Sequence, residues 1–196
     1  MTVPPSLVCR ELRLRQFRNF PDLDLRFPPP GAAVIGPNGS GKTNLIEALY
    51  YLEIFRSFRG APDDQLVRFG GEAFHIRGRF EDPGTGRELE VTAAYEKRRR
   101  KKVVTVDGAE AERLGDALGR IGAVVFSPSD VAIVAGAPGE RRRFLDILLS
   151  LNARGYLAAL QRYRHTLRQR NALLKEEAPP AQVEPWTAAL VDAGAT

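Results

Sequence analysis

The feature that most constrains this 196-residue chain is a short glycine-rich segment near its N-terminus. Residues 36–43 read GPNGSGKT, which fits the pattern G-x-x-x-x-G-K-[ST]. Glycine permits the positive φ angles with which successive backbone N–H groups surround a phosphate, and a following helix presents partial positive charge. The candidate ligands of a nucleoside triphosphate are Gly36, Pro37, Asn38, Gly39, Ser40, Gly41, Lys42 and Thr43.

The flanking residues supply the structural context that such a loop needs. Ala32–Ile35 is a short apolar run that predicts a buried strand before the loop. Thr43–Leu52 contains good helix formers and predicts a helix after it. In this context Lys42 is expected to bridge the β- and γ-phosphates of ATP, and the Thr43 hydroxyl to ligate Mg²⁺. The alternative is a glycine-rich turn without a ligand.

The rest of the chain predicts an α/β protein with two parts. Alternating apolar and polar residues indicate strands at 12–15, 23–27, 74–80, 89–95 and 103–106, with one antiparallel sheet over about 73–108. Beyond residue 108 we expect a short helix at 110–118, an apolar strand at 121–126, and helices at 140–151 and 154–175. We therefore predict an ATP-binding lobe over 1–108, with a P-loop and an antiparallel β-subdomain, and the start of a mainly helical second lobe over 109–196.

The charge of the chain suits a polyanionic partner. The net charge is +5, although most of the 29 basic residues are arginine, a skew that a coding bias also explains. Local clusters are more informative, above all the six consecutive basic residues 97–102. That run is either a solvated hairpin tip or a phosphate contact, and the triplet 141–143 suits DNA or a subunit interface. The candidate DNA contacts are Arg141, Arg142, Arg143, Arg164, Arg168, Lys101 and Lys102.

The composition also indicates the cellular location of the protein. No apolar run approaches the roughly 20 residues that a membrane-spanning helix needs, and the N-terminus does not resemble a secretory signal. A single cysteine, Cys9, cannot form an internal disulfide. We therefore expect a cytoplasmic protein without a membrane partner.

Several sequence blocks resemble a known family. LRQFRNF at 14–20, followed by GPNGSGKTNLIEALYYL from residue 36, resembles the SMC-like branch of the ABC ATPase superfamily. The blocks FRSFR at 55–59, FSPSD at 126–130, GERRRFLD at 139–146 and QRNALLK at 169–175 narrow the resemblance to the RecF family of bacterial DNA replication and repair proteins. The resemblance covers about residues 7–196. It implies that Arg18 and Asn19 approach the nucleotide, where the alternative is a strand end that faces solvent.

The resemblance implies an ATP-controlled protein of recombinational repair and replication restart, with a part in the SOS response to DNA damage. Such proteins form a homodimer around ATP and bind single-stranded, gapped and junction DNA. They act with RecO and RecR to help RecA onto DNA. The rival interpretation is another class of P-loop protein, either a small-molecule kinase or a transporter ATPase subunit.

Two motifs of ABC ATPases are missing. The apolar run 121–126 is followed by Ser127 where a Walker B acid is required, and nothing resembles the signature motif. We therefore expect the N-terminal part of a longer protein, without the C-terminal half of the fold. This chain is then expected to hold no catalytic residue and to be inactive alone, whereas the full-length protein is expected to be a weak ATPase.

Overall fold

The computed structural model describes residues 7–28, 31–153 and 155–195. The chain divides into two compact units, Met1–Ser127 and Pro128–Thr196. The candidate phosphate loop belongs to the first unit.

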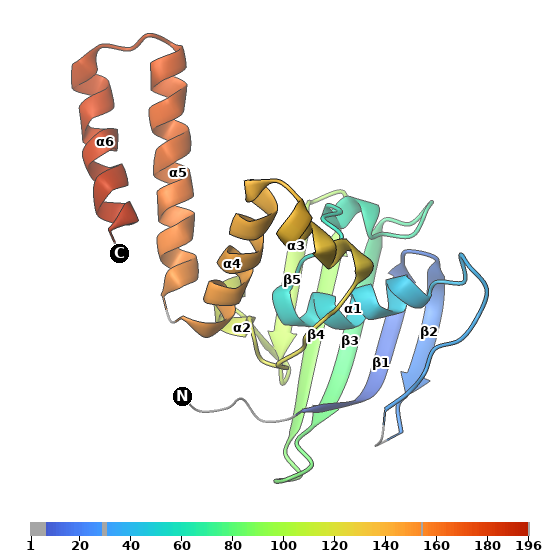
Figure 1. Ribbon diagram of the computed structural model, residues 1–196. Helices are drawn as coiled ribbons and strands as arrows, with labels where there is room; N and C mark the ends of the chain where they lie inside the picture. Colours follow the sequence, from blue (N-terminus) through green and yellow to red (C-terminus); the bar gives the residue numbers. More distant parts are fainter. Residues whose placement is uncertain (1–6, 29–30, 154, 196) are drawn as a thin grey trace. The chain divides into compact units, whose positions relative to one another are not determined.

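The first unit is built on a six-stranded sheet in the order β2-β1-β3-β4-β5-β6, with every neighbouring pair antiparallel (Figure 1). Its strands confirm those predicted at the same places and extend most of them by a few residues. The register pairs Leu14 with Leu23 of one neighbour and with Ile76 of the other, so apolar side chains gather on one face. The strands are β1 (Val8–Phe17), β2 (Phe20–Arg26), β3 (Ala73–Glu81), β4 (Glu88–Glu96), β5 (Lys101–Val106) and β6 (Ala109–Glu110).

Helix α1 (Lys42–Ile54) lies across that apolar face (Figure 1). It buries Leu45, Ala48, Tyr51 and Leu52 against the strands, and the ring of Phe74 meets that of Tyr51 edge to face at 5.4 Å. Each large apolar side chain buried in this way contributes about 1.5–3 kcal/mol. The helix approaches β3 so closely that a Cβ on Gly78 would lie 2.6 Å from the Leu52 side chain. Packing thus fixes the helix that follows the phosphate loop.

Two segments predicted as strands are not strands in the structure. Ala32–Ile35 and Ile121–Phe126 have no regular structure, and Ile35 and Phe126 are 93% and 92% exposed. A strand needs a neighbour to pair with its backbone N–H and C=O groups. Among the described residues, no strand pairs with either segment. Their apolar composition indicates a preference for burial but does not provide that neighbour.

Short elements complete the first unit. They are η1 (Asp63–Gln65) and α2 (Leu114–Ala117), so the helix predicted at 110–118 is much shorter than expected. Ala117 and Ile121 are buried in the core of this unit, which places residues 109–127 with it. The lobe division after residue 108 stays a prediction for the complete fold.

The second unit is helical, as predicted. Its long helices confirm those expected at 140–151 and 154–175, although residue 154 lies outside the described residues. Helices α5 and α6 form an antiparallel hairpin (Figure 1) that buries Thr166, Val183 and Ala193. None of the helices in the described part of the chain has the length and apolar character needed to cross a membrane. The elements are η2 (Pro128–Val131), α3 (Ala132–Ala135), α4 (Pro138–Asn152), α5 (Tyr156–Lys175) and α6 (Pro180–Gly194).

Candidate phosphate-binding site

The segment 36–41 forms a loop that leads directly into the N-terminus of α1. Gly39 and Gly41 have φ angles of 82° and 103°, in the region that glycine adopts without strain. Gly41 is the N-cap of the helix, and the first turn contains no acidic residue. The partial positive charge of the helix N-terminus is therefore not neutralised from within the first turn, an arrangement that favours a bound anion.

The two side chains expected to act on phosphate and metal follow the loop. The Lys42 ammonium donates to the carbonyl oxygens of Gly36 and Pro37, at 2.9 and 2.8 Å, so it lies over the loop. Thr43 is exposed in the first turn of α1. The structure thus brings the eight predicted residues together around one loop. Their contacts with ATP and Mg²⁺ stay predictions.

The two other candidate nucleotide contacts, Arg18 and Asn19, make different contacts in the structure. Asn19, in the β1–β2 turn, reaches the loop, where its Nδ2 donates to the Ser40 carbonyl at 3.2 Å. Arg18 turns instead toward α1 and donates from Nε and Nη2 to the Glu47 carboxylate, both at 2.8 Å. Asn19 is therefore part of the loop's surroundings, whereas the Arg18 guanidinium is engaged by a buried acid.

The polar group behind the loop was not predicted from the sequence. Glu47 is fully buried, and Ser57 and Arg59 join Arg18 around its carboxylate. A signal was present, because Glu47 stands four residues before the buried Tyr51 and so shares its helix face. An acid on the buried face of a helix requires partners.

The candidate DNA contacts of the second unit lie on α4 and α5. Arg142, Arg143 and Arg168 are exposed. Arg141 donates to the Gly136 carbonyl at 3.0 Å. Arg164 lies 2.5 Å from the Asp146 carboxylate, which also accepts from the Tyr156 hydroxyl at 2.8 Å. Of the two arginines predicted to share a face of α5, only Arg168 is not engaged by an acid.

Lys102, the last residue of the basic run 97–102, lies inside the first unit. Its ammonium lies 2.8 Å from Asp63 and 2.6 Å from the Phe55 carbonyl oxygen, above the ring of Tyr51. Burial lowers the pKa of Lys102, opposed by the hydrogen bond to Asp63. The side chain is 15% exposed and is therefore part of the packing, whereas Lys101 is exposed. The Lys102 side chain points toward α1, and its contact with DNA stays a prediction.

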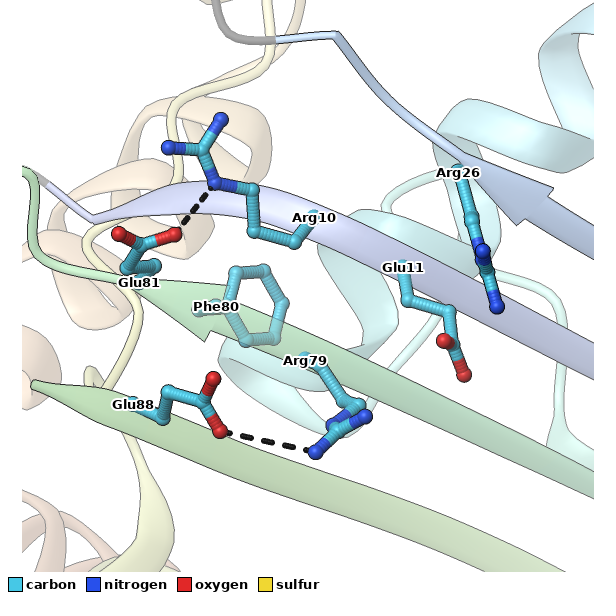
Figure 2. A pocket seen from close by; sticks show the side chains of 7 residues that line it. All are labelled: Arg10, Glu11, Arg26, Arg79, Phe80, Glu81 and Glu88. Carbon is cyan, nitrogen blue, oxygen red and sulfur yellow. Dashed lines mark hydrogen bonds and ion pairs between the residues drawn. The ribbon is translucent and has the colours of Figure 1, made fainter. Parts of the chain in front are cut away.

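A pocket of about 220 Å³ lies at the other end of β1 (Figure 2). It is lined mainly by charged side chains, and two of its arginines have acidic partners, with Arg10 2.7 Å from Glu81 and Arg79 3.5 Å from Glu88. Seven residues of strand separate Arg10 from the turn that carries Asn19. This pocket is not part of the phosphate loop.

Comparisons with known proteins agree with this geometry. The family model described as "AAA domain, putative AbiEii toxin, Type IV TA system" matches residues 32–132, just over half of the chain. The "DNA replication and repair protein RecF" of Chlorobium luteolum is 40% identical over 192 residues, which is 95% of this chain and 51% of that protein. The chain is a RecF-type member of this AAA-domain family. The RecF protein of Salinibacter ruber is 39% identical over 196 residues, covering 96% of this chain and 47% of the relative.

Solved structures show the same relationship in three dimensions. A structure of the recombination mediator protein RecF with ATP, in the RecFOR pathway, superposes on 99% of this RecF-type chain with a TM-score of 0.88 and 32% identity. The chain covers 52% of that structure. An SMC ATPase structure matches with a TM-score of 0.56 and 19% identity, covering 71% of this chain and 98% of its own, which shows a shared fold. The chain spans about half the length of the curated relatives it matches.

Proposed function

We propose that this chain binds Mg-ATP as the nucleotide-binding part of a RecF-type DNA repair protein. The observation that carries the proposal is the loop 36–41 at the N-terminus of α1, with Lys42 over it and no acid in the first helical turn. Backbone N–H groups of the loop and Lys42 would hold the phosphates, and the Thr43 hydroxyl would ligate Mg²⁺. The solved RecF with ATP supports this assignment.

We extend the proposal to the whole protein that carries this chain. It binds single-stranded, gapped and junction DNA in the cytoplasm, pairs with a second copy when ATP is bound, and acts with RecO and RecR to assist RecA. The names of the relatives, DNA replication and repair protein RecF, support this, as does the RecFOR pathway named for the solved structure. The net charge of +5 and the exposed arginines of α4 and α5 suit a DNA backbone.

The alternative functions fit the structure less well. A small-molecule kinase would use an arginine-rich helix to close over its substrate, and α5 is the helix with that composition. However, Arg164 and Arg170 of α5 are bound within their own unit, to Asp146 and Thr187. For a transporter ATPase subunit, the sequence offers no recognisable surface for a membrane partner, and none of the described helices could span a membrane.

A salt titration on the full-length protein tests the proposal. Affinity for gapped duplex DNA is measured with and without Mg-ATP over a range of ionic strength. A RecF-type protein should bind more tightly with Mg-ATP, and log K should fall linearly with log salt because phosphate contacts release counterions. The absence of DNA binding at low salt, together with tight Mg-ATP binding, would favour a kinase or transporter class.

A further inference from the structure

The carboxylate of Glu47 is the centre of a polar group behind the phosphate loop. Glu47 lies five residues after Lys42 on α1 and is 0% exposed. Arg18 donates to both of its oxygens at 2.8 Å, and the Ser57 hydroxyl donates to one of them. Arg18 is itself fixed, because its backbone N–H donates to the Leu66 carbonyl at 2.7 Å. The carboxylate therefore joins the β1–β2 turn, α1 and the segment after α1.

A chain of side-chain contacts continues from Glu47 to the loop. Arg59 lies 3.8 Å from the carboxylate and donates to Asn44 Oδ1 at 3.2 Å. Asn44 donates in turn to Asn19 Oδ1 at 2.8 Å, and Asn19 donates to the Ser40 carbonyl at 3.2 Å. Asn19 is also the neighbour of Arg18 in the β1–β2 turn. Two routes of contact thus connect Glu47 with Asn19. One passes through Arg18, which precedes Asn19 in the chain, and the other passes through the side chains of Arg59 and Asn44.

The contact from Asn19 to Ser40 bears on phosphate binding through peptide geometry. The peptide between Ser40 and Gly41 is planar, and its C=O and N–H point in opposite directions. Holding the Ser40 carbonyl toward Asn19 therefore aims the Gly41 N–H away from Asn19. The fit is close, since a Cβ on Gly41 would lie 2.6 Å from Asn19 Nδ2. Asn19 thereby sets the direction of one of the N–H donors that the proposed function assigns to phosphate.

We infer that Glu47 is a positioning residue of the nucleotide site, which orients the phosphate loop through Arg18, Arg59, Asn44 and Asn19. A buried carboxylate is costly unless its partners compensate for lost hydration, and packing alone would be satisfied by an apolar side chain. What the carboxylate adds is a fixed position for two guanidinium groups, each on a different segment. This inference rests on the proposed function, because it concerns the affinity for ATP.

The test compares two buried acids of the same helix. Glu53 is 2% exposed and accepts from the backbone N–H groups of Ile121 and Gly122 at 3.2 and 3.1 Å, outside the contacts that reach the loop. Glu47→Gln and Glu53→Gln both neutralise a buried carboxylate of α1 without removing its volume. Affinity for Mg-ATP is measured by calorimetry and stability by urea unfolding, on the same samples of this chain.

We expect Glu47→Gln to weaken Mg-ATP binding by roughly tenfold or more, the effect typical of residues that orient a binding group. Glu53→Gln should leave the affinity for Mg-ATP within about twofold of the wild type. Its loss in free energy of unfolding should be comparable to that of Glu47→Gln. Asn19→Ala, at an exposed position, should weaken binding as Glu47→Gln does. The double variant should bind no worse than the weaker single variant, because both changes interrupt one set of contacts.

The outcomes separate the inference from the function on which it rests. Wild-type protein that does not bind Mg-ATP would contradict the proposed function itself. Wild-type binding with equal affinities for Glu47→Gln and Glu53→Gln, or additive losses in the double variant, would overturn the role of Glu47 alone. If Glu47→Gln does not fold, Asn19→Ala and Asn44→Ala decide, and normal affinity in both would overturn it.

Discussion

Lys102 is bound to Asp63 inside the first unit, with 2.8 Å between its Nζ and Oδ2. The other carboxylate oxygen of Asp63 accepts from the Tyr51 hydroxyl at 2.8 Å. The pair therefore ties β5 to η1 and to α1, the helix that follows the phosphate loop. The last cation of a run of six basic residues is a structural residue rather than part of a charged surface.

We predict that Lys102→Met lowers the free energy of unfolding by about 2–3 kcal/mol. Removing one partner of a largely buried pair leaves the other charge without compensation, and charge-assisted hydrogen bonds are lost with it. Lys101→Met is the matched control, because Lys101 is exposed on the adjacent position and should change stability by about 0.5 kcal/mol or less. Urea unfolding measures both. Equal effects would show that the ion pair does not stabilise the unit.

A second prediction concerns Cys9 in β1. Burial raises the pKa of the Cys9 thiol to about 12, partly offset by a hydrogen bond with the backbone of Glu11. The thiolate is the reactive form, so alkylation at pH 8 should be roughly 1000-fold slower in the folded protein than in urea, where the pKa is about 8.5. Iodoacetamide labelling followed by mass spectrometry gives both rates.

The raised pKa of Cys9 also makes the stability of the protein depend on pH. Because the folded pKa of Cys9 lies above the unfolded value, its contribution is complete below about pH 8.5 and is lost as the pH rises from there toward 12. Cys9→Ala should remove that part of the decline in stability above pH 8.5. Labelling of the folded protein as fast as in urea would contradict the burial of the thiol.

The parts of the fold that depend on local pattern were predictable from the sequence. The glycines of the loop, the helix after it and the hairpin β3–β4 follow from backbone freedom and from periods of 3.6 and 2 residues. The irregular runs 32–35 and 121–126 were not, since strand formation depends on a neighbour that composition does not reveal. The inward orientation of Lys102 could have been predicted from its position in β5. Lys102 stands two residues before the buried Val104 in β5, so its side chain points to the same face.

The network behind the loop depends on contacts between distant residues. Arg18 and Glu47 are separated by 29 positions, and no periodicity links them. The family resemblance implied that Arg18 approaches the nucleotide, and in the structure its guanidinium is bound to the buried Glu47. An acid on the buried face of α1 indicates that a partner exists without identifying which basic residue it is.

A third prediction distinguishes the two arginines of α5 in DNA binding by the full-length protein. Arg168→Gln should reduce the slope of log K against log salt by roughly 0.7–0.9, the effect of one lost phosphate contact. Arg164→Gln should reduce it by less than half as much, because Asp146 already neutralises Arg164. Affinity should fall equally for all DNA sequences, since phosphate contacts carry no base information. An unchanged slope for Arg168→Gln would show that this face of α5 does not contact DNA.

A fourth prediction is that this chain alone does not hydrolyse ATP measurably. Ser127 follows the apolar run 121–126 where an acid is needed to hold the metal, and no segment resembles the signature motif. Phosphate release by purified chain should equal that of the buffer and of the Lys42→Ala variant. Steady turnover that disappears in Lys42→Ala would show that the missing motifs are not required.

The most direct test of the account is Mg-ATP binding by this chain and by its Lys42→Ala and Thr43→Ala variants. Neither side chain is part of the core, so both variants should keep the wild-type circular dichroism spectrum. Calorimetry should show tight Mg-ATP binding by the wild type. Lys42→Ala should lose it with or without magnesium, and Thr43→Ala should lose mainly the magnesium-dependent part of the affinity. Unchanged affinity in both folded variants would contradict the assignment of residues 36–43 as a phosphate-binding loop.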